Sequence, residues 1–326
     1  PEYRHCLISL SRGGADATVV REFDTVTRNF VADGFELPEA KSSTSWKDEN
    51  TLWVGTDFGQ GSLTESGYPR ITKEWKRGES LGEASIVFEG SQKDVSAFTY
   101  STHTPEGRYD IVAVVPEIFR GTNYMLLGNR KVKLDLPDDA QLRGFFKDHM
   151  LVSLRSPWET GGTEYPEGGL IAIGVDEFLA GSRQFKLIFA PAETTSLRSV
   201  RATPNYLLYT ALDNVRGRLY RVSLTDGDWN EDEIELPGIG TVSVGSTNDT
   251  TGDFFFTYTD FLTPSSLYLV SDNRSPLPVK SSPAWFDSTG MEVVQHEAVS
   301  KDGTRIPYFL VMPEGFEADG SNPTLI

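Results

Sequence analysis

Short runs in which aromatic or β-branched residues alternate with polar ones recur along the whole chain. The clearest is Phe254–Val270, where two strand-like apolar segments flank a turn-forming Thr263-Pro264-Ser265-Ser266. Five earlier segments resemble the first half of this pair, and we assign all six as innermost strands of blades: Cys6–Leu10, Thr51–Thr56, Ser96–Ser101, Met150–Leu154 and Tyr206–Ala211, with Phe254–Thr259. Neighbouring segments lie about 45 to 56 residues apart, close to the roughly 40–50 residues of a four-stranded propeller blade.

Each of these six segments is followed, after a polar loop, by a second strand-like run. These runs are Ala17–Phe23, Ile71–Trp75, Tyr109–Val115, Leu170–Val175, Leu219–Leu224 and Leu267–Val270. Polar turns precede several of the first segments, and we interpret them as loops between the innermost and second strands of a blade: Lys47–Asn50, Lys147–His149, Thr203–Asn205 and Thr250–Asp253. The one helix-like stretch, Val175–Ala180, is long enough for a single turn. The pattern therefore predicts an all-β fold, and its steady period favours a β-propeller over a sandwich or a barrel.

The repeat pattern ends near the C-terminus of the chain. Met291–Phe316 contains a strand, a Lys301-Asp302-Gly303-Thr304 turn and a second strand, which is typical of a hairpin outside a blade. Ser281–Asp287 would be the linker. We therefore predict a propeller over residues 1–287, with six visible repeats and an incomplete first blade, and the start of a second domain over residues 288–326.

Composition limits the partners. Hydrophobic residues make up 38% of the 326 residues, enough for a sizeable core, and no run reaches the roughly 18 apolar residues of a membrane helix. The net charge of −17 argues against nucleic acid as a partner, because such a surface repels phosphate. We expect a soluble chain with no membrane partner. Both ends look cut, since the chain opens without Met or a signal peptide and stops on an apolar strand-like segment, so we expect a fragment.

Cysteine and histidine give little support for metal or cofactor chemistry. The single cysteine, Cys6, excludes an internal disulfide and a Cys-rich metal site, and its apolar surroundings favour a buried inert thiol. The four histidines are scattered without metal-ligand spacing: His5, His103, His149 and His296. We expect no metal and no cofactor.

Several segments, in the right order, resemble the prolyl oligopeptidase family of serine peptidases. Ser300–Ile326 is similar to the first strands of that family's peptidase domain. Tyr258, Phe261 and Pro264 match a Tyr-x-x-Phe-x-x-Pro signature of the last blade. Leu10–Asp24, Gly34–Gly59 and Ser66–Gly78 are similar to a bacterial branch of the family. The resemblance covers essentially the whole chain and leaves both the cytoplasm and the periplasm of a bacterium open as the compartment.

The resemblance implies a propeller of seven blades in the intact protein, lying over an α/β-hydrolase domain of the same polypeptide. In that family the propeller limits access to short peptides, and the hydrolase domain cleaves after proline through Ser, Asp and His, by an acyl-enzyme. The Gly-rich oxyanion segment, the nucleophile elbow and the other triad residues would lie beyond Ile326. No catalytic residue is therefore assigned to any position of this chain, and we expect the chain itself to be inactive.

The strongest candidates for substrate binding are Tyr68 and Arg70, in the Gly-containing loop Glu65–Arg70. An aromatic ring and a cation on a long loop are suited to binding, since binding residues concentrate on loops held by a rigid scaffold. The alternative, which the sequence favours, is a structural turn with Arg70 in a surface ion pair. Trp53 and Phe58, on the same blade, are expected in the core.

Other motifs are better explained by structure than by chemistry. Ser243 lies in a Thr-Val-Ser-Val-Gly run that lacks the first glycine and the helix of a nucleophile elbow, so a strand serine is expected. Ser11–Asp16 could bind an anion, but a hairpin turn is favoured. Asp228–Glu235 and the pair Asp138-Asp139 could bind calcium, but a solvated blade edge is favoured. The alternative for the whole chain is a non-catalytic propeller that binds or scaffolds other molecules.

Overall fold

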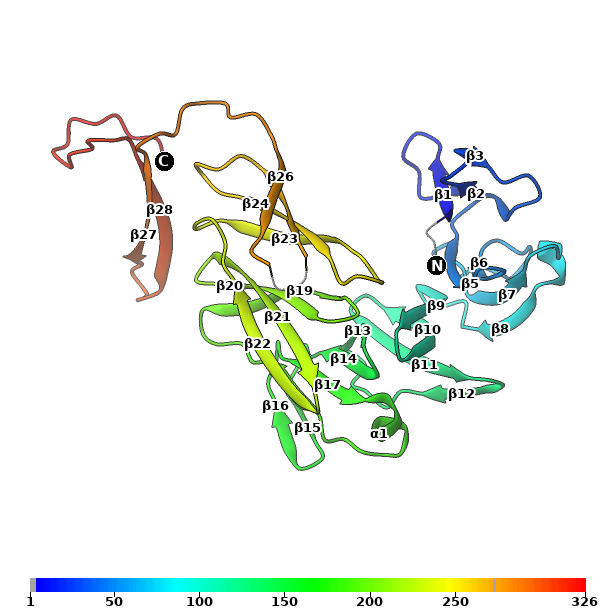
Figure 1. Ribbon diagram of the computed structural model, residues 1–326. Helices are drawn as coiled ribbons and strands as arrows, with labels where there is room; N and C mark the ends of the chain where they lie inside the picture. The colour runs from blue at the N-terminus through cyan, green and yellow to red at the C-terminus, as the bar shows by residue number, and fades with distance from the viewer. Residues whose placement is uncertain (1–3, 272–273) are drawn as a thin grey trace. The chain divides into compact units, whose positions relative to one another are not determined.

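Residues 4–271 and 274–326 are described by a computed structural model, in which antiparallel sheets follow one another along the chain (Figure 1). The chain divides into two compact units, one of Pro1–Phe145 with Val152–Trp158 and one of Phe146–Leu151 with Glu159–Ile326. The described part contains a single five-residue α-helix, α1 (Val175–Leu179), and one short 3-10 turn (Leu81–Glu83). The predicted single helical turn is confirmed, and none of the described helices could cross a membrane.

Three sheets precede residue 140, each listed here in chain order. The first contains β1 (His5–Ser11), β2 (Thr18–Asp24), β3 (Asn29–Phe30) and β4 (Glu36–Ala40). The second contains β5 (Ser43–Asp48), β6 (Thr51–Gly55), β7 (Ile71–Lys76) and β8 (Ser85–Glu89). The third contains β9 (Ser96–Thr104), β10 (Gly107–Glu117), β11 (Arg120–Leu127) and β12 (Arg130–Lys133). The first sheet is only three strands wide, because β3 and β4 pair with different parts of β2.

Three further four-stranded sheets follow. One contains β13 (Gln141–Phe146), β14 (His149–Ser153), β17 (Leu170–Gly174) and β18 (Lys186–Phe189), with the hairpin β15 (Trp158–Thr160) and β16 (Thr163–Tyr165) inserted. The next contains β19 (Thr195–Ala202), β20 (Leu207–Asp213), β21 (Arg216–Thr225) and β22 (Asp228–Ile234). The last contains β23 (Thr241–Thr247), β24 (Phe254–Thr259), β25 (Ser266–Val270) and β26 (Leu277–Ser281). A separate hairpin, β27 (Glu292–Val299) and β28 (Arg305–Met312), completes the described chain.

Alternation of side chains along the strands builds the core. In β24 the aromatic side chains of Phe254, Phe256 and Tyr258 are buried on one face, as a period of two requires. They pack with residues of β20, β21 and β23 in one apolar cluster of the second unit. In the first unit a similar cluster contains Leu37, Trp75 and residues of β6. Consecutive sheets thus bury their faces against each other within each unit, as in repeat architectures.

The predicted repeat is confirmed by six four-stranded sheets among the described residues. The polar turns were correctly interpreted as first-to-second strand loops, since they join β5 to β6, β13 to β14, β19 to β20 and β23 to β24. The assignment of the recurring apolar segments as innermost strands was less accurate. Four of the six are second strands, whereas Cys6–Leu10 and Ser96–Ser101 belong to the first strands β1 and β9. A second strand has sheet partners on both sides, so it is the most apolar of its blade.

Candidate functional site

The loop between β6 and β7 carries the two predicted binding residues, and Arg70 holds it in place. The Arg70 Nε atom donates to the Gly61 carbonyl at 2.7 Å, and Nη1 donates to the Gly90 carbonyl and to Glu89 Oε1, both at 2.8 Å. The side chain is only 14% exposed. The guanidinium therefore ties the start of the loop to the segment after β8, and its ion pair with Glu89 is the contact that the structural alternative expected.

Tyr68 has a different environment. Its side chain is partly exposed, and its hydroxyl donates to Asp16 Oδ2 at 3.1 Å. The Lys41 ammonium lies 4.1 Å from the centre of the ring and 3.5 Å from Asp16 Oδ2. Such a cation over an aromatic face contributes about 0.5–1 kcal/mol when exposed. Tyr68 thus presents an aromatic surface with a fixed orientation, between a cation and a carboxylate.

Backbone contacts preorganise the loop around Tyr68. The Thr64 amide donates to the Tyr68 carbonyl at 2.8 Å, and the Gly67 amide donates to the Thr64 carbonyl at 2.9 Å. Gly67 has a φ of +78°, which a side chain at this turn would disfavour. The structure therefore brings Tyr68 and Arg70 into one ordered loop in which Arg70 is the support and Tyr68 the exposed group. Trp53 of the same sheet is buried and donates to Ser101 Oγ, as expected for a core residue.

The remaining sequence candidates take structural roles. Ser243 lies in β23, opposite Thr257, with no helix after it. Ser11–Asp16 is the turn between β1 and β2. The acidic run forms β22, the outer strand of its sheet, where Glu231 and Glu233 accept hydrogen bonds from Tyr209 and Arg218. Among the residues that the structure describes, no group of three or more His, Cys, Asp or Glu side chains could hold a metal ion.

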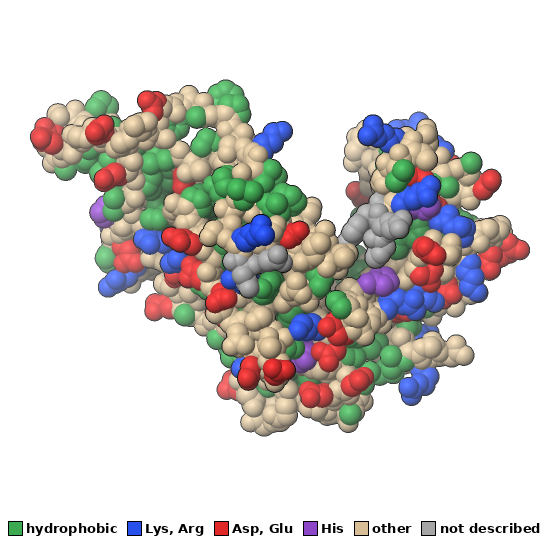
Figure 2. Space-filling view, viewed as in Figure 1, with side chains coloured by type: hydrophobic (Ala, Val, Ile, Leu, Met, Phe, Trp, Pro, Cys, Tyr) green, Lys and Arg blue, Asp and Glu red, His purple; other side chains and the backbone are tan. Residues whose placement is uncertain are grey.

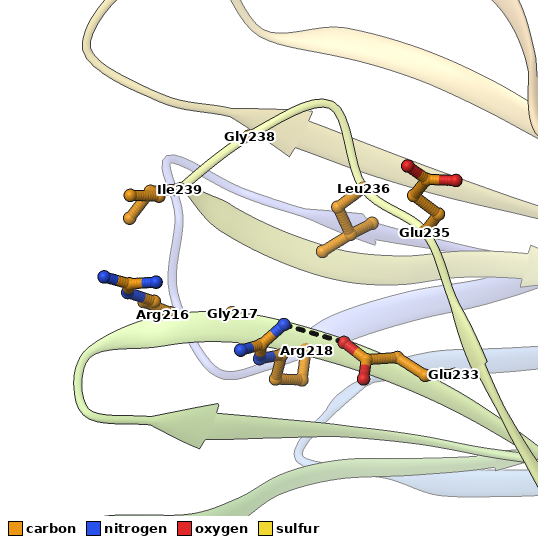
Figure 3. Close-up of a pocket in the computed structure, with 8 residues that line it drawn as sticks. All are labelled: Arg216, Gly217, Arg218, Glu233, Glu235, Leu236, Gly238 and Ile239. Carbon is orange, nitrogen blue, oxygen red and sulfur yellow. Dashed lines mark hydrogen bonds and ion pairs between the residues drawn. The ribbon is translucent and has the colours of Figure 1, made fainter. Parts of the chain in front are cut away.

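A pocket that the sequence analysis missed lies in the second unit, between the start of β21 and the segment from β22 to β23 (Figure 3). Its volume is about 260 Å³, and it is lined by Arg216, Gly217, Arg218, Glu233, Glu235, Leu236, Gly238 and Ile239. The Arg218 guanidinium bridges Glu233 at 2.9 Å and Asp213 at 3.4 Å. Burial by itself lowers the pKa of Arg218, but the charges and hydrogen bonds of Glu233 and Asp213 outweigh it and raise the pKa above its usual value.

Glycines make this pocket wall possible. The Gly217 amide donates to the Gly240 carbonyl at 2.8 Å, and a Cβ on Gly217 would lie 2.7 Å from that oxygen. A Cβ on Gly240 would lie 2.3 Å from the Thr259 carbonyl oxygen. The run Pro237-Gly238-Ile239-Gly240 and the sequence Arg216-Gly217-Arg218 were the available signals, because close backbone approach requires glycine.

The signature around Phe261 forms a defined loop between β24 and β25. Tyr258 is fully buried, and its hydroxyl donates to Asp260 Oδ2 at 2.7 Å. Burial, followed by this hydrogen bond to a carboxylate, raises the pKa of Tyr258 well above its usual value. Asp260 Oδ1 in turn accepts from the Leu262 amide at 2.8 Å and from the Thr263 amide. The buried tyrosine therefore holds the turn in place through Asp260. Phe261, in the same turn, is 53% exposed.

Comparison with known proteins assigns this architecture to a class. The family model described as "Prolyl oligopeptidase, N-terminal beta-propeller domain" matches residues 1–279. The six sheets are therefore blades of a β-propeller. The chain belongs to the prolyl oligopeptidase family.

Relatives and solved structures agree with this assignment. The chain is 36% identical over 340 residues to an uncharacterized peptidase of Sinorhizobium fredii, covering 100% of this chain and 46% of the relative. An uncharacterized peptidase of Rickettsia prowazekii is 28% identical over 338 residues, with 98% and 47% covered. The structure of a post-proline cleaving enzyme from Rickettsia typhi matches with a TM-score of 0.86 and 26% identity, covering 98% of this chain and 49% of that one. The chain spans about half the length of these relatives.

Charge on the surface fits the composition. Acidic and basic side chains are interspersed over the face shown in Figure 2, within a chain whose net charge is −17.

Proposed function

We propose that this chain is the access-controlling propeller of a serine oligopeptidase that cleaves short proline-containing peptides. The observation that carries the proposal is the family-model match over residues 1–279, together with the similarity to a post-proline cleaving enzyme across 98% of the chain. The reaction would proceed by an acyl-enzyme on a serine activated by histidine, with an oxyanion hole. These groups would be supplied by an α/β-hydrolase domain of the same polypeptide.

The proposed domain boundary lies near residue 287. Residues 1–287 would form the propeller, of seven blades in the intact protein, with an incomplete first blade here. The narrow first sheet, in which β3 and β4 share one edge of β2, supports the incomplete blade. Residues 288–326, which include β27 and β28, would begin the hydrolase domain.

Within this function, Tyr68 is the proposed substrate contact and Arg70 its support. The exposed ring of Tyr68 offers an apolar face on which a proline ring or another peptide side chain can pack. The nearby Lys41 and Asp16 offer a cation and a hydrogen-bond acceptor for peptide groups. The hydrogen bonds of the Arg70 guanidinium hold in place the loop that carries Tyr68.

The function is tested in the full-length polypeptide with a chromogenic peptide that carries proline before the scissile bond. We expect hydrolysis that an active-site serine reagent abolishes, and no hydrolysis by the 326-residue chain alone. Turnover by the chain alone would contradict the proposal that the catalytic groups belong to the hydrolase domain. Absence of peptidase activity in the full-length polypeptide would favour the binding or scaffolding alternative.

The roles of Tyr68 and Arg70 are tested in the same assay. Tyr68→Ala should lower kcat/KM about threefold to tenfold, because an aromatic contact contributes about 0.5–1.5 kcal/mol beyond its buried area. Arg70→Ala should lower kcat/KM and also the stability of the β6–β7 loop. Phe119→Ala is the matched control, since Phe119 is an exposed aromatic of a turn in the same unit. Unchanged kinetics for both loop variants would refute the substrate role.

A further inference from the structure

The hairpin β27–β28 contacts the blades through the side-chain amide of Gln295, whose nitrogen and oxygen both form hydrogen bonds. Gln295 Nε2 donates to the Asn214 carbonyl at 2.6 Å, and Gln295 Oε1 accepts from Arg216 Nε. Asn214 and Arg216 belong to the tight turn between β20 and β21. Because the acceptor contact involves a guanidinium, it is a charge-assisted hydrogen bond and stronger than a neutral one.

The turn that receives Gln295 is rigid and strained. Asn214 has a φ of +46° and Val215 a φ of +70°. Asparagine tolerates this left-handed region, whereas a β-branched residue is rare there and is kept only where the surroundings impose it. The Asn214 amide also donates to the Thr194 carbonyl at 2.9 Å. The Asn214 carbonyl that binds Gln295 is therefore held in a defined orientation.

A second contact comes from the residue directly across the hairpin. Phe309 is the cross-strand partner of Gln295. Its ring lies 5.4 Å from that of Phe261, the outward-facing residue of the β24–β25 loop. Residues directly opposite each other in an antiparallel pair project from the same face. One rung of the hairpin thus binds two different blades, through an amide at one end and an aromatic ring at the other.

The hairpin has little to hold it in place besides this rung. Val299, Ile306, Tyr308 and Val311 are exposed, and the two strands pair only with each other among the described residues. A lone two-stranded hairpin is marginally stable in water. Its order therefore depends on docking to the blades.

We propose that the Gln295–Phe309 rung is a detachable latch that fixes the β27–β28 hairpin to the turn of β20–β21 and the loop of β24–β25. When the latch is closed, Arg216 donates its Nε hydrogen bond to Gln295. Arg216 also lines the pocket of Figure 3. When the latch opens, the hairpin moves as one piece and Arg216 becomes free to bind an acidic or carbonyl group. The biological role rests on the proposed function, since the hairpin would begin the hydrolase domain and the latch would set how firmly that domain is held.

Hydrogen–deuterium exchange of the 326-residue chain tests the latch directly. Gln295→Ala should raise exchange of the β27–β28 amides about tenfold, equivalent to 1.4 kcal/mol, and leave the amides of β19–β22 unchanged. Phe309→Ala should act in the same way. Gln184→Ala is the matched control, because Gln184 also donates its amide to a backbone carbonyl, that of Gly161, away from the hairpin.

Two further variants separate a latch from general instability. Gln295→Glu can still accept from Arg216 but cannot donate to the Asn214 carbonyl, so its exchange should lie between wild type and Gln295→Ala. The double variant Arg216→Ala with Gln295→Ala should exchange no faster than Gln295→Ala alone. Both substitutions remove the same Arg216–Gln295 hydrogen bond, so its loss is not added twice. Unchanged exchange in Gln295→Ala and Gln295→Glu, or an equal rise in every sheet, would overturn the latch.

The latch and the proposed function fail in different ways. Faster hairpin exchange in a polypeptide that never hydrolyses proline peptides would keep the latch and remove the peptidase. Normal hydrolysis with unchanged exchange in the Gln295 variants would keep the peptidase and remove the latch.

Discussion

The phenolic hydroxyl of Tyr258 lies 2.7 Å from Asp260 Oδ2 and connects the buried face of the last blade to the loop that carries Phe261. The tyrosine is fully buried, and the carboxylate also accepts two backbone amides of its own turn. One side chain of the core thereby determines where an exposed aromatic of the surface is placed. The spacing of Tyr258 and Phe261 in the sequence therefore places a buried anchor and an exposed ring on the same turn.

Tyr258→Phe should destabilise the chain by about 1.5–3 kcal/mol, because it removes a hydrogen bond to a charged group and leaves the carboxylate without that donor. Denaturant unfolding measures the change. Tyr268→Phe is the control, since Tyr268 lies in the same sheet and its hydroxyl has no hydrogen-bond partner within the described residues. Equal stability of the two variants would show that the Tyr258 hydroxyl contributes nothing.

Arg77→Met should be among the most damaging single substitutions in the first unit. Glu22 is buried, and Arg77 contacts both of its carboxylate oxygens at 2.8 and 2.9 Å. Without Arg77 the buried carboxylate keeps only the Phe35 amide and His5 as partners. Removing one partner of a buried ion pair costs about 3–5 kcal/mol. Arg12→Met is the control, because Arg12 is 84% exposed in its ion pair with Glu39 and should change stability by less than about 1 kcal/mol. Unfolding curves at pH 7 compare the two.

The same pair predicts an opposite pH dependence in wild type and variant. Burial by itself raises the pKa of Glu22, but hydrogen bonds from Arg77 and the Phe35 amide outweigh it and lower the pKa below 4.5. Its contribution to stability is therefore present above pH 4.5 and is lost as the pH falls through the folded pKa. Without Arg77 only the Phe35 amide and His5 oppose the burial, so the pKa of Glu22 rises. The stability difference between wild type and Arg77→Met should therefore shrink as the pH falls from 7 towards 4; a constant difference would contradict the assignment.

Gly240→Ala should destabilise the second unit by about 1–3 kcal/mol or more, because the added methyl group would lie 2.3 Å from the Thr259 carbonyl oxygen. Gly245→Ala, a few residues further along the chain, has its nearest contact at 3.5 Å and should be close to neutral. Thermal unfolding distinguishes them. A neutral Gly240→Ala would mean that the backbone can separate here at little cost.

Val215→Gly should stabilise the chain by about 1 kcal/mol. The substitution relieves a strain of about 1–3 kcal/mol at φ +70° and loses about 0.5–1 kcal/mol to the freedom of glycine in the unfolded chain. Asn214→Gly is the control, because asparagine already tolerates this conformation and should gain nothing. A lower melting temperature for Val215→Gly would show that the valine side chain packs more than its 50% exposure indicates.

Much of the fold follows from local pattern. Alternating residues set the strands, Gly and Asn set the turns, and the recurrence of strand pairs sets the six blades, since each of these depends on residues close together in the chain. The order of the segments also indicated the family. The glycine, the aromatic ring and the cation in the loop that ends with Tyr68 and Arg70 marked that loop as unusual. The division of roles within that loop was not readable, because Arg70 is fixed by the carbonyls of Gly61 and Gly90 from two other segments.

The sequence by itself thus determined the repeat, the turn chemistry and the family. Only the tertiary structure decided which side chains meet: Gln295 binds a turn 81 residues away, and Arg77 reaches Glu22 across 55 residues. Such contacts depend on how whole sheets stack and twist against each other. No periodicity within one strand encodes that geometry. The contacts of Gln295 and the buried ion pair of Arg77 could therefore not be predicted from the sequence.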